Sequence, residues 1–361
     1  ILTPTALPVV TGNAMTAERW RRSLVGMGLD VRVIATEGCT AQDLVRDIAR
    51  FSPDVLHVHN TFRAGRLLLD PVLASYWDHL PLVVSPSGTD MNIESRVLGR
   101  REIVGTVLQR ADAIIVQSQE GRARLREIVP ARMDRIFFAP KAFVWLGEED
   151  EDLRESVGVP PGGLLFFMPA GIRPVKGNLE CLLGFENVHG RCPHARIVFS
   201  GPALDKEYAD RFRKELQRLK GFARWVPPIT PSAMRSAYAS ADVVLNGSFS
   251  EGLSNVLIEG KAAGKPLLAS DIPGNRWPVL GDQGDTPMGL LFDPANSGDF
   301  ADKAMRLIDD AGLRTRLGEA GAAYARRMPG PCDEARALVA VYERAMGCCT
   351  EQRVSSFGSR V

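Results

Sequence analysis

Short apolar runs alternate with longer amphipathic stretches along most of the 361 residues. The apolar runs predict strands at 31–34, 55–59, 81–85, 113–116 and 135–138, and in a second series at 164–168, 195–199, 223–226, 243–246 and 266–269. Stretches with helical spacing lie between them, for example at 14–26 and 41–51. Strands that alternate with helices are typical of parallel sheets with crossover helices. We therefore predict an α/β protein made of two Rossmann-like, doubly wound halves.

Two glutamates of the second half stand where the pattern changes from strand to helix. Glu251 follows the apolar run 243–246 and a Gly/Ser turn, and Glu259 lies in the first turns of the helix predicted from Ser254. Carboxylates accept hydrogen bonds from sugar and ribose hydroxyls, and the free amides of a helix N-terminus suit a phosphate. The segment Gly252-Leu253-Ser254 would supply these amides. The alternative is an ordinary capped helix with two exposed glutamates.

Two cations follow the first strand of the second series. Arg173 and Lys176 lie in the loop 171–178, between the predicted strand 164–168 and a helical stretch. Ligands of α/β folds bind at the carboxyl ends of strands, where Arg offers a planar fork and Lys a mobile point charge. These cations are candidates for binding a diphosphate, although surface cations on a loop would give the same pattern.

The residues around both motifs resemble one family. Ser250-Glu251-Gly252-Leu253-Ser254, with Glu259 eight positions after Glu251, resembles the E-x7-E motif of retaining glycosyltransferases of the family 4 (group 1) type. Arg173 to Gly177 is similar to that family's Arg-x-x-Lys-Gly motif. The resemblance implies the GT-B fold, in which two Rossmann-like domains face a cleft, and a retaining glycosyltransferase (EC 2.4) acting on a nucleoside-diphosphate sugar.

The resemblance also implies the roles of the site residues. Arg173 and Lys176 would neutralise the departing diphosphate without a metal or other cofactor, Glu251 would hold sugar hydroxyls, and Glu259 would hold the ribose. Gly201 follows the strand 195–199 where the family has a glycine near the ligand, and the backbone at Val226 lies where the family reads the base. UDP is the expected nucleotide. Asp150-Glu151-Asp152 matches a metal-binding D-x-D only formally, and we interpret it as part of a solvated linker helix.

The first half is expected to bind the acceptor and the other side of the donor. Gly12 and Asn13 open a helix, where glycine allows backbone amides near a phosphate or sugar. His59 ends an apolar strand on the same face as His57, so one imidazole could be core and the other could face the cleft. Ser87 and Asp90 lie in Ser85-Pro86-Ser87-Gly88-Thr89-Asp90, where many family members have a histidine before the glycine. This departure resembles the glycosyltransferase 1 domain-containing proteins and bacterial selenosugar synthases.

Composition narrows the partners. A net charge of +1 gives no bulk field that would recruit nucleic acid. No apolar run approaches the ~20 residues of a spanning helix, although peripheral membrane contact stays compatible with the sequence. The six cysteines show no metal-ligand spacing. The sequence also shows no basic segment at its start that would indicate a signal peptide, so we expect a cytoplasmic protein. The acceptor is a small molecule, a glycan or a lipid, and the sequence does not reveal the oligomeric state.

We expect the first domain at 1–145 and the nucleotide-sugar domain at 160–328, after the turn at 160–163. The helical stretch 331–347 resembles the terminal helix that returns to the first domain in this fold, and 348–361 is expected to be a disordered tail. Three alternatives share the fold: a nucleotide-sugar epimerase, a phosphorylase, and a non-catalytic nucleotide-sugar binder. An epimerase needs acid and base groups at the sugar carbon, and a phosphorylase needs a lysine for pyridoxal phosphate. Neither pattern is evident in the sequence.

Overall fold

The computed structural model describes residues 1–77 and 80–358, which form two compact units. The first unit comprises Ile1–Val144 and the helix that begins after Pro329, and the second comprises Trp145–Met328. The second unit begins earlier than the expected residue 160. Its boundary shifts because Leu153 and Val157 are buried and Trp145 packs against the same core cluster.

The first unit is built on a parallel sheet with the strand order β2-β1-β3-β4-β5-β6. Its strands are β1 (Leu2–Thr3), β2 (Ile34–Ala35), β3 (Leu56–His59), β4 (Leu82–Ser85), β5 (Ala113–Val116) and β6 (Ile136–Phe138). The helices around it are α1 (Gly12–Val25), α2 (Ala41–Phe51), η1 (Gly65–Leu69), α3 (Pro71–Trp77), α4 (Gly88–Asn92), η2 (Glu94–Arg96), α5 (Arg100–Arg110), α6 (Gln119–Ile128), η3 (Pro130–Arg135) and α15 (Pro331–Gly358).

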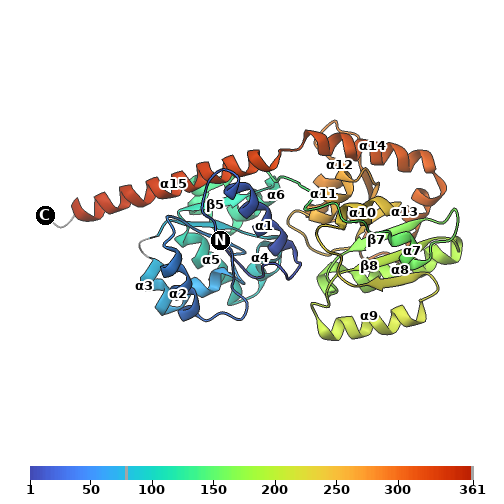
Figure 1. Ribbon diagram of the computed structural model, residues 1–361, viewed down its shortest axis with the longest axis horizontal. Helices are drawn as coiled ribbons and strands as arrows, with labels where there is room; N and C mark the ends of the chain where they lie inside the picture. Colours follow the sequence, from blue (N-terminus) through green and yellow to red (C-terminus); the bar gives the residue numbers. More distant parts are fainter. Residues whose placement is uncertain (78–79, 359–361) are drawn as a thin grey trace. The chain divides into compact units, whose positions relative to one another are not determined.

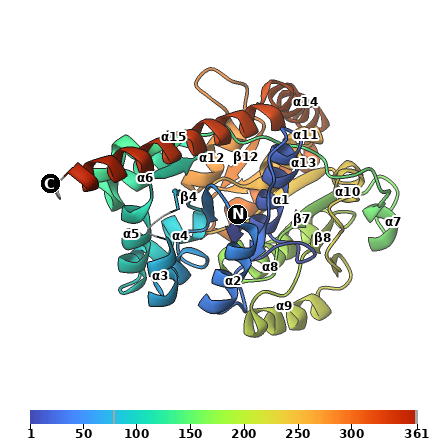
Figure 2. The same ribbon diagram turned by 60° about the vertical axis from the view of Figure 1, so that its left-hand side comes forward.

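Alternation along β4 shows why both faces of this sheet are covered. Leu82 and Val84 pack into the cluster formed with α2, α3 and α5, whereas Val83 packs into the cluster formed with α1 and α15. Successive side chains of a strand point to opposite faces, so a continuous apolar run requires helices on each side. In both views α15 crosses one side of the unit, and α2, α3 and α5 lie on the other (Figures 1 and 2).

The second unit repeats this plan with the strand order β12-β11-β10-β7-β8-β9, all parallel. Its strands are β7 (Leu165–Pro169), β8 (Arg196–Ser200), β9 (Ala223–Val226), β10 (Val243–Asn246), β11 (Leu267–Ser270) and β12 (Gly289–Phe292). Its helices are α7 (Leu153–Val157), η4 (Pro174–Lys176), α8 (Asn178–Arg191), α9 (Lys206–Arg218), α10 (Met234–Ser240), α11 (Asn255–Ala262), α12 (Pro273–Leu280), α13 (Ser297–Asp309) and α14 (Ala311–Arg327).

The structure differs from the sequence-based expectation in several details. The strand expected at 31–34 is reduced to Ile34–Ala35, and β12 was not anticipated. Asp152 of the acidic run caps α7 by accepting a hydrogen bond from the Arg154 amide at 2.8 Å. The helix α15 continues to Gly358, where we expected a disordered tail from 348, because no proline or glycine interrupts 348–357. Residues 359–361 of that expected tail lie outside the described residues.

Within the described ranges, no helix combines the length and the apolar character needed to cross a membrane.

Candidate functional site

The loops after β7 and β10 meet at one edge of the second sheet. The two strands pair in parallel, so their carboxyl ends lie side by side. Gly177 has φ +64, and a Cβ there would lie 2.2 Å from the carbonyl oxygen of Gly247. Only glycine fits this approach without strain. The contact brings the Arg173 and Lys176 loop against the Glu251 loop.

Lys176 and Glu251 form a half-buried ion pair. The Nζ of Lys176 donates to Oε1 of Glu251 at 2.6 Å, and the same carboxylate oxygen accepts from the Ser248 hydroxyl at 2.7 Å. Burial raises the pKa of Glu251, but the charge of Lys176 and the hydrogen bonds from Lys176, Ser248 and Asn246 outweigh it. The pKa therefore lies below its ordinary value, and Glu251 is ionised at neutral pH.

Arg173 supplies a second cation with an unsatisfied donor. Its Nε is buried and has no hydrogen-bond partner within the described chain. Burial lowers the pKa of Arg173, and only the charge of Glu251 opposes this. A buried donor on a charged group costs free energy unless an acceptor satisfies it. An anionic ligand at this loop would supply that acceptor.

Glu259 lies on α11, whose N-terminus adjoins the same loop. The hydroxyl of the fully buried Tyr238 donates to Oε2 of Glu259 at 2.7 Å and orients the carboxylate. Ser254 is the N-cap residue, but its hydroxyl accepts from Asn246 at 2.8 Å, and no side chain within the described residues caps α11. The amides of the first turn and the positive end of the helix dipole thus remain suited to an anion.

The other predicted donor residues lie at the same sheet edge. Gly201 follows β8 with φ +154, and a Cβ there would lie 2.3 Å from the carbonyl oxygen of Ala170. Val226 ends β9 and pairs with Ser200 of β8. Gly252 and Leu253 are half-buried beside Glu251. The donor-side residues predicted in the second half therefore lie at the ends of β10, β7, β8 and β9, four neighbouring strands, or in the segments that follow them.

In the first unit two of the predicted acceptor-side residues, Ser87 and Asp90, form a hydrogen-bonded cluster with Asn60 near the ends of β3 and β4. Asn60 follows His59 with φ +79, and its amide donates to the Ser87 hydroxyl at 2.7 Å. Asp90 is fully buried and accepts from the amides of Thr61 and Ser87 and from the Ser87 hydroxyl. Burial raises the pKa of Asp90 to about 6, against those hydrogen bonds. Asp90 is placed to hold the Ser87 loop, and Ser87 itself is half-buried.

The histidines are both in the interior of this unit. His57 and His59 are 2% and 5% exposed, and Trp20 stacks on His57 and meets His59 edge-on. Burial lowers the pKa of His59 to about 3, so its imidazole is neutral. Its Nε2 is buried without a hydrogen-bond partner among the described residues. Trp20 of α1 covers both imidazoles.

The α1 N-terminus is formed as the sequence indicated. Thr11 is its N-cap and accepts from the Ala14 amide at 3.2 Å, so Gly12 and Asn13 are the first residues of the helix. Gly12 is exposed and Asn13 half-buried.

Sequence reasoning missed the residues that support the two glutamates. Asn246, Ser248 and Tyr238 hold the carboxylates or their loop, and Asn275 donates to Asn246 at 3.4 Å from α12. One signal was available, since a polar Asn246 ends an otherwise apolar strand just before a glycine. Tyr238 gave no such signal, because its spacing on α10 fits an ordinary core residue.

Comparison with known proteins identifies the class. The family model described as glycosyl transferases group 1 matches residues 149–324, and the glycosyl transferase 4-like domain matches residues 38–142. Together with the two parallel Rossmann-like units, these matches define a GT-B glycosyltransferase. The chain belongs to the group 1 glycosyltransferases, as the sequence motifs indicated.

Two relatives extend over most of the chain. It is 26% identical over 321 residues to D-inositol 3-phosphate glycosyltransferase of Corynebacterium glutamicum, covering 80% of this chain and 75% of that one. It is 24% identical over 318 residues to glycosyltransferase 1 domain-containing protein 1 of Xenopus tropicalis, covering 85% and 87%. The second match agrees with the resemblance noted at Ser87.

Solved structures share the fold. HepE of Anabaena in complex with UDP and glucose superposes with a TM-score of 0.75 at 17% identity, covering 95% of this chain and 98% of that one. Sucrose-phosphate synthase of Thermosynechococcus elongatus gives a TM-score of 0.73 at 17% identity, covering 96% and 94%.

Proposed function

We propose that this glycosyltransferase moves a sugar from a UDP-sugar to a hydroxyl of its acceptor with retention of anomeric configuration. The observation that carries the proposal is the Lys176 to Glu251 ion pair beside the unsatisfied Arg173 donor. Structures of HepE with UDP support the choice of nucleotide. The name of the Corynebacterium relative, D-inositol 3-phosphate glycosyltransferase, supports a small hydroxylated acceptor.

The ion pair accounts for donor binding in two steps. Without a donor, Lys176 neutralises the half-buried Glu251. A diphosphate would draw Lys176 and Arg173 toward its oxygens, so that Glu251 would accept hydrogen bonds from sugar hydroxyls in place of the one from Lys176. Glu259, oriented by Tyr238, would accept from the ribose. Both carboxylates position the donor and transfer no proton.

In the transfer step the bond between the anomeric carbon and the phosphate oxygen breaks, and the acceptor oxygen bonds to that carbon from the same face. The acceptor's proton passes to the leaving diphosphate. Negative charge grows on the diphosphate as the bond breaks, so the fixed charges of Arg173 and Lys176 stabilise the transition state more than the ground state. We assign the acceptor to the first unit, where Asp90 holds the Ser87 loop.

Thermal stabilisation by a panel of UDP-, GDP- and ADP-sugars tests the donor assignment. A ligand at 100 times its Kd stabilises the folded state by ~2.7 kcal/mol. At least one UDP-sugar should raise Tm, and Lys176→Ala should abolish that shift. The matched control is Lys206→Ala, which removes an exposed lysine from α9 and should behave as wild type.

Failure of every nucleotide sugar to raise Tm, or an undiminished shift in Lys176→Ala, would remove the diphosphate from this loop. Once a donor is known, NMR of the product distinguishes retention from inversion. Release of UDP only in the presence of an acceptor separates a transferase from a protein that merely binds the nucleotide sugar.

A further inference from the structure

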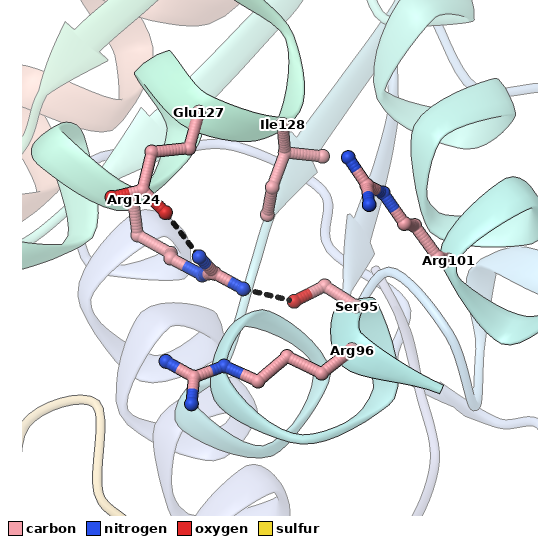
Figure 3. Close-up of a pocket in the computed structure, with 6 residues that line it drawn as sticks. All are labelled: Ser95, Arg96, Arg101, Arg124, Glu127 and Ile128. Carbon is pink, nitrogen blue, oxygen red and sulfur yellow. Dashed lines mark hydrogen bonds and ion pairs between the residues drawn. The ribbon is translucent and has the colours of Figure 1, made fainter. Parts of the chain in front are cut away.

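The first unit carries a basic pocket on the segment that joins β4 to β5 and on α6. The pocket has a volume of about 270 Å³ and is lined by Ser95, Arg96, Arg101, Arg124, Glu127 and Ile128. The arginines come from η2, α5 and α6, and Figure 3 shows their side chains around one recess. This pocket gathers three arginines, although the net charge of the whole chain is only +1.

The three arginines of the pocket differ in whether a neighbouring group of the protein binds their guanidinium. Arg124 is held by the Met91 carbonyl at 3.0 Å and the Ser95 hydroxyl at 3.1 Å, and it pairs with Glu127. The nearby Glu94 is taken by Arg100 at 2.7 Å. Within the described chain, neither Arg96 nor Arg101 has a side-chain hydrogen bond or ion pair. The pocket thus combines one fixed guanidinium with two that remain available to an anion.

An exposed apolar loop lies between the two available arginines. In Arg96-Val97-Leu98-Gly99-Arg100-Arg101, Leu98 is 91% exposed and Val97 is 40% exposed. Gly99 has φ +78, which permits the turn that holds Leu98 away from the core. A single exposed leucine is ordinary on a protein surface. An almost fully exposed one flanked by three arginines, with no carboxylate in the segment, pairs an apolar anchor with positive charge.

We propose that this loop docks on an anionic lipid bilayer, with Leu98 inserting at the interface and the pocket binding a lipid phosphate. Apolar side chains entering the headgroup region and arginines near anionic lipids both favour peripheral binding. The volume lies below the roughly 300 to 1,000 Å³ of pockets that enclose drug-sized ligands, which suits a phosphate group better than a whole nucleotide sugar. The inference is independent of the donor assignment, because none of these residues belongs to the second unit.

Sedimentation with vesicles tests the proposal on the full chain. The protein should pellet with vesicles of phosphatidylcholine and phosphatidylglycerol, but not with phosphatidylcholine alone. Binding should weaken when salt rises from 0.1 to 1 M, since the Debye length falls from ~10 to ~3 Å. Equal binding to both vesicle types, or to neither, would overturn the proposal.

Variants assign the binding to the loop. Each arginine near an anionic surface contributes about fivefold, equivalent to ~1 kcal/mol, so Arg96→Ala with Arg101→Ala should lower the partition coefficient about 25-fold. Leu98→Ala should lower it about tenfold by removing apolar area. The matched controls are Val25→Ala, another exposed apolar residue, and Arg211→Ala on α9. Wild-type binding by the loop variants, or equal losses in the controls, would refute the assignment.

A second experiment distinguishes binding of a lipid phosphate from binding of a soluble phosphate. Inorganic phosphate is titrated into wild type and Leu98→Ala by calorimetry. Weak phosphate binding together with strong, Leu98-dependent vesicle binding supports the bilayer. Tight phosphate binding with vesicle binding unaffected by Leu98→Ala would assign the pocket to a soluble anion instead. The UDP-sugar stabilisation should be unchanged in these variants, so this test and that of the donor site fail separately.

Discussion

Lys261 is a buried charge that the fold tolerates at a cost, and its replacement should stabilise the protein. The side chain is fully buried on α11, and its Nζ has no hydrogen-bond partner among the described residues. The Nζ lies 4.3 Å from the centre of the Tyr324 ring and 4.9 Å from that of the Trp277 ring. Burial lowers the pKa of Lys261 from 10.5 to about 8, although Asp282 and Asp285 oppose the change.

The expected change in the free energy of unfolding follows from the difference between the folded and unfolded pKa values of Lys261. At 1.36 kcal/mol per pH unit, carrying the charge in the folded state costs ~3 kcal/mol relative to the unfolded chain. Cation–π contacts in a desolvated site return ~2 kcal/mol. Methionine has a similar length and no charge, so Lys261→Met should raise the free energy of unfolding at pH 7 by ~1–2 kcal/mol.

The pH dependence distinguishes this reasoning from simple repacking. The folded-state pKa lies below the unfolded value, so the cost is complete below pH 8 and disappears as the pH rises to 10.5. Urea denaturation of both proteins at pH 7 and pH 10 should show the advantage of Lys261→Met shrinking toward zero. Lys214→Met, at an exposed position of α9, should change little at either pH. A variant less stable than wild type at pH 7, or an advantage that does not change with pH, would refute the argument.

Three further predictions concern the buried ion pair between Arg19 of α1 and Glu334 of α15, and the donor site. Glu334→Ala should lower the free energy of unfolding by roughly 3–5 kcal/mol, because the buried Arg19 loses the carboxylate that lies 2.7 Å from its Nε, whereas Glu343→Ala on the exposed side of α15 should cost little in the same denaturation assay. Transfer activity, followed as UDP release, should survive EDTA, because we propose that Arg173 and Lys176, rather than a metal, neutralise the diphosphate; loss restored by magnesium or manganese would contradict this. Arg173→Lys should lower kcat by more than it raises the donor KM, because a point charge does not reproduce a bidentate fork, and wild-type kinetics would place the diphosphate elsewhere.

Local patterns were sufficient to predict most of the fold. Most of the runs that became β3 to β11 are apolar on both faces because helices cover both, and such runs are visible without knowledge of tertiary contacts. The Glu251 and Arg173 loops were also predictable, since carboxyl ends of neighbouring parallel strands meet at one edge. β12 was missed because Gly289 to Phe292 follows a loop rich in Gly and Asp and itself begins with glycine.

Other features depend on residues distant in the chain. Glu334 accepts from Arg19, from the Trp20 indole at 2.8 Å and from Gln117, the residue after β5, at 2.7 Å. No local pattern connects α1 and the end of β5 with α15. The arginine pocket joins three elements in the same way. Burial of both histidines likewise follows from Trp20, which lies nearly forty positions earlier on α1. Sequence periodicity indicates that a residue is buried, but not which partner satisfies its polar atoms.

Because α15 belongs to the first unit but follows the second unit in the chain, it also affects the order in which the two units can fold during synthesis. Ala335, Leu338 and Tyr342 of α15 fill one face of the first unit, alongside Trp20. Domains generally fold as units while the polypeptide emerges from the ribosome. Here the second unit, Trp145–Met328, emerges as one uninterrupted segment, while the first still lacks the helix that covers Trp20. The second unit can therefore reach its native state before the first. The apolar face of the first unit around Trp20 stays uncovered until α15 has been translated.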